Sequence, residues 1–275
     1  MSTGEIQLPC TIFVDEIAYC NTYVLSRLVA CFLLPEIQWI FVGDFSQPQA
    51  HGHWRGQLCR NGLFVGGKFS SFLPRDYLLL DDDKRSRCPI LKDFRARLRQ
   101  AQDADIPAFI AEGRKLFRAP PPFAVTIVIS HAKRRKLCRA ADVRWRKANP
   151  DVSNRILDTD DLGEIAVYVG MSLKALQTTP LVKGLWYWLR CLDPIELEEQ
   201  SLRWGETSRR VVTVSPDTFK KDVTATTAVT AASVQGETIQ GTVCVADLLN
   251  PHMQRRDVLE MAAGRAVHSE NLRFM

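Results

Sequence analysis

Short apolar runs and one helical pattern alternate over the start of the chain. Residues 11–14 and 37–42 are rich in β-branched and aromatic side chains, which predicts two buried strands. Between them Asn21 is a suitable helix N-cap, and apolar residues recur at helical spacing as far as residue 32. A strand, a helix and a strand in this order form a βαβ unit with parallel strands. We therefore expect the residues that follow the two strands to meet at one sheet edge, where open α/β sheets bind ligands.

The middle of the chain predicts a junction and then a second set of elements. Residues 47–71 are glycine-rich and irregular, and a short strand at 77–80 precedes three consecutive aspartates, which indicate a domain boundary. Further elements are expected as helices at 90–101 and 106–117, a strand at 123–129, and a basic helix that Ser130 caps.

From residue 156 to residue 214 the pattern changes to short strands separated by turns, which predicts a small β-rich insertion. The remaining pattern predicts strands at 226–231 and 242–246, a helix near 258–263 and a short final strand. The expected fold class is therefore α/β with a β-rich insertion.

Composition and charge narrow the class of protein. With 275 residues and 46% hydrophobic content the chain can form two globular domains, and its net charge of +5 is compatible with nucleic acid. Its eight cysteines contain no C-x-x-C pair, so we expect free thiols in a reducing compartment. The N-terminus lacks a signal-peptide pattern, and no segment has about 18 consecutive apolar residues. These features predict a soluble, intracellular protein, nuclear or cytoplasmic, without a membrane partner.

Two carboxylates follow the first predicted strand. Asp15 and Glu16 can simply end it, or Asp15 can hold Mg²⁺ while Glu16 polarises the water that attacks a terminal phosphate. The second strand ends in Gly43-Asp44-x-x-Gln47, which places an amide side chain where it can sense a bound phosphate. The two patterns together favour a nucleotide site over a structural strand end.

At this point the sequence resembles the superfamily 1 DNA helicases, especially the RecD-like and Dda-like motors. IFVDE and FVGDFSQ are similar to the Walker B strand and the following motif of that family. Residues 80–86, LDDDKRS, are similar to L-x-x-N-Y-R-S, which places Arg85 at a γ-phosphate contact with Arg87 as a competing register.

Two later segments extend the resemblance in the same order. Residues 228–239, AVTAASVQGETI, are similar to A-x-T-x-H-K-x-Q-G-x-T-I, except that Ala232 and Ser233 replace His-Lys. Residues 261–274 are similar to the closing motif A-L-S-R-A-x-x-x-x-N-L, with Gly264 in place of Ser or Thr.

The resemblance implies a P-loop NTPase fold with a RecA-like helicase core. Residues 1–83 would form a partial first domain, and 84–275 a second RecA-like domain with the β-rich insertion at about 156–214. ATP and Mg²⁺ are the implied cofactors, and single-stranded or duplex DNA is the implied partner. The implied catalytic residues are Asp15, Glu16, Gln47 and Arg265, with Asp15 as the magnesium ligand. The implied nucleotide-binding residues are Asp44, Arg85, Arg87, Gln235, Gly236 and Glu237, and those for nucleic acid are Thr230, His131, Arg134 and Arg135.

The Walker A loop of this family has no match before Asp15. Residues 62–68 fit G-x-x-x-x-G-K but lack the following Ser or Thr and the flanking strand and helix, so we interpret them as a chance match. We therefore expect a truncated first domain and weak or absent ATP hydrolysis by this chain alone. The alternatives are a non-catalytic remnant that binds nucleic acid or is completed by a second chain, and a different P-loop ATPase, which the Arg265 motif disfavours.

Overall fold

The computed structural model describes residues 9–16, 36–43, 78, 86, 88–178, 180–202, 206–239 and 241–275. The predicted helix after Asn21 and the predicted strand at 77–80 fall on residues outside this part, apart from residue 78. None of the helices in the described ranges is both long and apolar enough to cross a membrane. The described cysteines are all free thiols: Cys10, Cys88, Cys138, Cys191 and Cys244.

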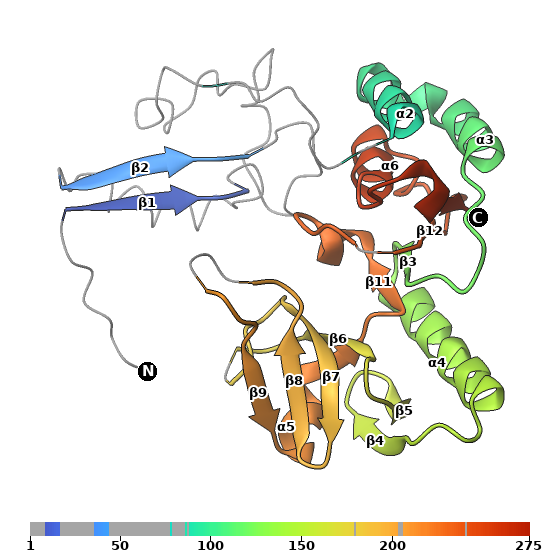
Figure 1. The fold of residues 1–275 in the computed structure, drawn as a ribbon. Helices are drawn as coiled ribbons and strands as arrows, with labels where there is room; N and C mark the ends of the chain where they lie inside the picture. Colours follow the sequence, from blue (N-terminus) through green and yellow to red (C-terminus); the bar gives the residue numbers. More distant parts are fainter. Residues whose placement is uncertain are drawn as a thin grey trace.

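The N-terminal strands form the predicted parallel pair. Strand β1 (Cys10–Val14) lies beside β2 (Ile37–Phe41), and Val14 pairs with Phe41 at their carboxyl ends (Figure 1). The backbone N–H of Val42 donates to the carbonyl of Val14 at 2.9 Å. The register therefore brings Asp15 and the chain after Val42 to the same sheet edge, as the sequence predicts.

The C-terminal α/β unit has a four-stranded parallel sheet in the order β11-β3-β12-β13. Its strands are β3 (Val125–Val128), β11 (Ala228–Thr230), β12 (Val243–Val245) and β13 (Leu272–Phe274). Its helices are α2 (Pro89–Gln100), α3 (Ile106–Leu116), α4 (His131–Ala148) and α6 (Arg256–Ala263). Short 3₁₀ turns are η3 (Asp103–Asp105), η4 (Ala231–Val234) and η5 (Ser269–Asn271). Most strand residues are apolar and buried, because helices cover both faces of the sheet.

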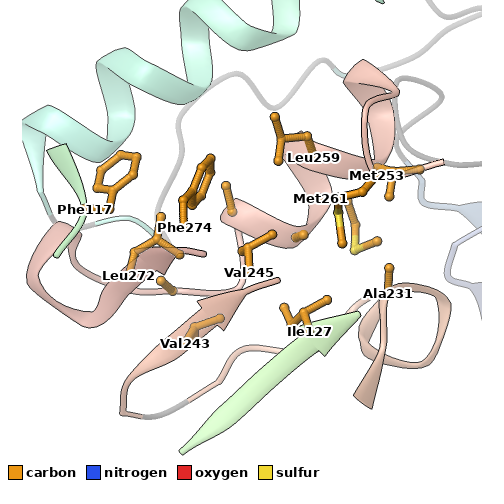
Figure 2. Packing of buried hydrophobic residues seen from close by; sticks show 14 of the residues in the cluster. Phe117, Ile127, Ala231, Val243, Val245, Met253, Leu259, Met261, Leu272 and Phe274 are labelled. Carbon is orange, nitrogen blue, oxygen red and sulfur yellow. The ribbon is translucent and has the colours of Figure 1, made fainter. Parts of the chain in front are cut away.

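One large core lies between this sheet and the helices α2, α3 and α6. Figure 2 shows Ile127 of β3 and Val245 of β12 facing the layer that contains Leu259 and Met261 of α6. On the opposite face, Val128 and Cys244 pack with Leu137 of α4. This burial fixes α6, and with it the closing motif, against one face of the sheet.

The β-rich unit has its own core. A five-stranded antiparallel sheet runs in the order β10-β6-β7-β8-β9, and a separate hairpin joins β4 to β5. The hairpin and sheet strands are β4 (Arg155–Thr159), β5 (Gly163–Val167), β6 (Ser172–Ala175), β7 (Trp186–Leu192), β8 (Ile195–Glu199), β9 (Val211–Val214) and β10 (Val223–Ala225). Helix α5 (Pro216–Asp222) leads into β10. The sequence predicted neither element, because the predicted strand at 226–231 begins after β10 and corresponds to β11.

Candidate nucleotide and nucleic-acid site

The carboxyl end of β1 turns sharply at its two acidic residues. Glu16 has φ of +51°, a left-handed conformation that is uncommon for a residue with a side chain. Its backbone N–H donates to Oδ1 of Asp15 at 2.8 Å, which stabilises the turn. Asp15 itself is exposed, whereas Glu16 is half-buried. The turn thus separates the two carboxylates, with Asp15 open to a cation.

Glu16 lies against the segment after β11. A Cβ atom placed on Gly236, whose φ is +80°, would lie 3.5 Å from Oε1 of Glu16. In Figure 1 the orange loop after β11 extends toward β1 and β2. Two segments that are 220 positions apart (16 to 236) and that the resemblance assigns to one nucleotide site are therefore side by side. Glycine at residue 236 accommodates the positive φ, whereas the 3.5 Å distance is an ordinary van der Waals contact.

Gln235 brings a buried amide to the same turn. Its Nε2 and Oε1 atoms are both shielded from solvent and have no hydrogen-bond partner among the described residues. Buried side-chain amides are normally paired, because an unsatisfied donor or acceptor costs about 1–3 kcal/mol. A polar ligand or an ordered water at this turn would satisfy Gln235.

Arg265 is buried beneath the turn, with only 2% of its surface exposed. Its Nε donates to the carbonyl of Met261 at 2.9 Å, and its Nη1 donates to the carbonyl of Glu237 at 2.7 Å. The backbone N–H of Ile239 in turn donates to the carbonyl of Arg265 at 3.1 Å. The guanidinium therefore ties the closing motif to residues 235–239. Its implied role in neutralising phosphate charge stays a prediction.

The glycine before Arg265 has a steric explanation. A Cβ atom on Gly264 would lie 2.9 Å from Nη2 of Arg95, which packs over this position. Arg95 is held there because its Nε and Nη2 donate to Glu260 Oε1 at 3.1 and 2.8 Å, and both side chains are almost fully buried. Serine at residue 264 would displace this ion pair. Arg95 was not among the predicted site residues, although it interrupts the apolar stripe of α2 between Leu91 and Leu98.

The basic start of α4 has a structural role in the described contacts. Arg134 is 7% exposed; its Nη2 contacts the Asp161 carboxylate, and its Nη1 donates to Oγ1 of Thr224 at 3.1 Å. The Nε of Arg135 donates to Asp161 Oδ1 at 3.1 Å. His131, by contrast, is exposed at the first turn of the helix, which Ser130 caps. These arginines join α4 to the β4–β5 hairpin, and their predicted contact with nucleic acid remains untested.

Asp161 gives this junction a defined pH dependence. Burial raises the pKa of its carboxyl, but the hydrogen bonds from Arg134 and Thr224 outweigh burial and hold the pKa below the ordinary 3.8. A lowered pKa in the folded state means that the stabilisation is present at neutral pH and is lost as the pH falls through the folded value.

We expect Asp161→Asn to lower the free energy of unfolding at pH 7 by about 2 kcal/mol, because Arg134 loses a charged acceptor. The difference from the unmodified chain should shrink as the pH falls below about 4, measured by urea unfolding at several pH values. Asp158→Asn is the matched control, since Asp158 pairs with Lys220 at the surface. An equal effect of the two substitutions at all pH values would contradict this assignment.

Several predicted site residues lie outside the described part of the chain: Asp44, Gln47, Arg85 and Arg87. Thr230 is described and is 5% exposed at the end of β11, where its carbonyl accepts a hydrogen bond from Oγ of Ser233 at 2.9 Å. Among the described residues, no cluster of three or more His, Cys, Asp or Glu side chains is arranged to hold a metal ion. A magnesium ion on Asp15 would therefore need further oxygen ligands from phosphate, water or other residues.

The fold has counterparts among solved helicases. It is similar to Pif1 helicase from Candida albicans, with a TM-score of 0.60 and 14% identity over 96% of this chain and 72% of that one. Bacteroides Pif1 in complex with ADP-AlF3 and single-stranded DNA gives a TM-score of 0.60 and 14% identity over 96% of this chain and 70% of that one. Another Bacteroides Pif1 structure, bound to single-stranded DNA, gives a TM-score of 0.55 and 13% identity over 96% of this chain and 70% of that one.

No protein-family model matches the sequence, and a search of the curated proteins gives no match. At such low identity the structural likeness concerns the fold. The expected α/β class with a parallel sheet is confirmed, and the fold is similar to that of the Pif1 helicase structures.

Proposed function

We propose that this chain is part of an ATP-driven DNA translocase of superfamily 1, of the RecD-like or Dda-like kind. The observation that carries the proposal is the approach of Glu16 to Gly236. This contact places the Glu16 carboxylate, at the end of β1, beside the turn at Gly236 in the C-terminal α/β unit. The buried Arg265 contacts the same turn through the carbonyl of Glu237. Helicases that hydrolyse ATP between two RecA-like domains need such groups on both sides of the nucleotide. The proposed domains are 1–83 and 84–275.

The proposed chemistry divides the roles among the two sides. Asp15 is exposed and would hold Mg²⁺, which supplies charge neutralisation for the phosphates. Glu16 would orient and polarise the attacking water, while Gln47 with Arg85 or Arg87 would contact the γ-phosphate. On the other side, Gln235, Gly236 and Glu237 would contact the nucleotide. Arg265 would stabilise the developing charge, for which its guanidinium must exchange a carbonyl for a phosphate oxygen.

The proposed nucleic-acid partner is DNA. Thr230, His131 and the arginines of α4 are the candidate contacts, and closure of the nucleotide site would move them relative to β1 and β2. Two of the similar Pif1 structures contain single-stranded DNA. Single-stranded binding would be salt-dependent, because phosphate contacts release counterions.

A second candidate function is a non-catalytic module that a further segment or chain completes. Phe13 of β1 is 68% exposed and Val42 is 43% exposed, so apolar surface remains around the short sheet. An added phosphate-binding strand and helix could cover such surface.

Binding and turnover of the 275-residue chain distinguish the two candidates. We expect salt-dependent binding of a labelled oligo-dT, measured by fluorescence anisotropy, with weak or undetectable DNA-stimulated ATP hydrolysis. Strong hydrolysis that Glu16→Gln abolishes would show a self-sufficient motor and would exclude the non-catalytic module. Hydrolysis that Glu16→Gln leaves unchanged would contradict the role of Glu16. A folded chain that binds no DNA and hydrolyses no ATP would contradict both candidates.

A further inference from the structure

The face of the five-stranded sheet that points away from its own core contacts the α/β unit through Trp186. Lys174 of β6 and Trp186 of β7 are paired across the sheet, next to the pair of Leu173 and Tyr187. Leu173 and Tyr187 are buried in the core of the β-rich unit, so the alternation of strand residues puts Lys174 and Trp186 on the other face. Trp186 packs there against the main core of the α/β unit. Lys174 is thus held at the boundary between the two units.

The Lys174 ammonium reaches the turn that follows β11. Its Nζ donates to the carbonyl of Ser233, and it lies 5.8 Å from the centre of the Trp186 ring, within the range of a cation–π contact. Burial lowers the pKa of Lys174, and the nearby Glu237 carboxylate opposes this effect. Ser233 lies near the end of η4, where carbonyl groups attract a cation.

The position of this contact coincides with a departure in the sequence. Ser233 stands where the helicase pattern has lysine, and Ala232 where it has histidine. The hydroxyl of Ser233 donates to the carbonyl of Thr230 at 2.9 Å and brings no charge to the turn. Lys174, 59 positions earlier in the chain, brings an ammonium to the backbone of this same residue.

We propose that Lys174 supplies from β6 the cation that residues 232 and 233 lack, and that it contacts a phosphate of single-stranded DNA beside Thr230. An ammonium has three donors, so the bond to Ser233 leaves donors for a phosphate oxygen. The Trp186 ring and the Ser233 carbonyl fix the long side chain before DNA binds, which reduces the entropic cost of the contact. This inference rests on the proposed function and adds the β-rich unit to the path of the DNA.

The test measures the affinity of the full chain for labelled oligo-dT over a range of salt concentrations. We expect Lys174→Met to weaken binding about tenfold, and to reduce the slope of log K against log salt by about 0.7, the value for one phosphate contact on a single strand. Lys174→Arg should bind like the unmodified chain. Ser233→Lys added to Lys174→Met should restore both affinity and slope, because it returns the charge to the turn.

Lys220→Met is the matched control, because Lys220 is a lysine of the same unit that pairs with Asp158 at the surface; it should change neither quantity. Thermal unfolding of every variant separates loss of binding from loss of folding, and the arginine and double variants keep the test valid if Lys174→Met is unstable. The inference would be overturned if Lys174→Met weakened binding without changing the slope of log K against log salt, and if Ser233→Lys did not restore binding. Lys174 would then have only a structural role. Unchanged binding by Lys174→Met overturns the inference alone, whereas an unmodified chain that binds no DNA overturns the proposed DNA partner as well.

Discussion

Replacement of Glu260 by alanine is expected to lower the free energy of unfolding by about 3–5 kcal/mol. Glu260 Oε1 accepts hydrogen bonds from Arg95 and from Arg99 Nε, the latter at 3.0 Å, and the Glu260 side chain is only 5% exposed. The substitution would leave the Arg95 guanidinium buried without its carboxylate. Removal of one partner of a buried ion pair is costly because the remaining charge stays desolvated.

The exposed pair of Arg97 and Glu112 provides the control for this result. Its side chains are 44% and 35% exposed, so Glu112→Ala should cost no more than about 1 kcal/mol. Urea unfolding followed by circular dichroism measures both variants under the same conditions. Equal costs for Glu260→Ala and Glu112→Ala would contradict the expectation that the Arg95 guanidinium stays desolvated once Glu260 is removed.

Arg265→Ala is expected to destabilise the fold by about 3 kcal/mol, in addition to any effect on phosphate chemistry. Arg265 is the largest fully buried side chain among the described residues. Its loss leaves a cavity and removes the donors to the carbonyls of Met261 and Glu237. We also expect the turn at residues 235–237 to loosen, so loss of activity in this variant would not by itself identify a catalytic arginine.

Arg255→Ala separates this effect from a general loss of positive charge. Arg255 occupies the N-cap position of α6, the helix that ends just before Arg265. Its side chain is 51% exposed and pairs with Asp257, so its replacement should cost less than about 1 kcal/mol. The loss of unfolding free energy for Arg265→Lys should lie between the losses for Arg265→Ala and Arg255→Ala, because one ammonium can replace part of the planar guanidinium contact. Unfolding of Arg265→Ala at the same urea concentration as the unmodified chain would contradict the structural role.

Much of the fold follows from local patterns. The predicted helix at 90–101 and strand at 211–214 match α2 (Pro89–Gln100) and β9 (Val211–Val214), and the two N-terminal strands pair in parallel as expected. These elements have apolar residues at the period of the structure they form, so the signal lies within one element. Strand β10 (Val223–Ala225) was not predicted, because three residues carry too little pattern.

The sequence by itself determined the order of the helicase-like motifs and the meeting of Asp15 and the chain after Val42 at one sheet edge. Only the tertiary structure decided the partner of each buried charge. Arg95 pairs with Glu260, 165 positions away, and Lys174 donates to the carbonyl of Ser233, 59 positions away. Periodicity reports the environment of each residue but not the identity of its distant partner. The partner of a buried charge depends on how separate elements pack, and that packing is set by the whole core rather than by any one segment.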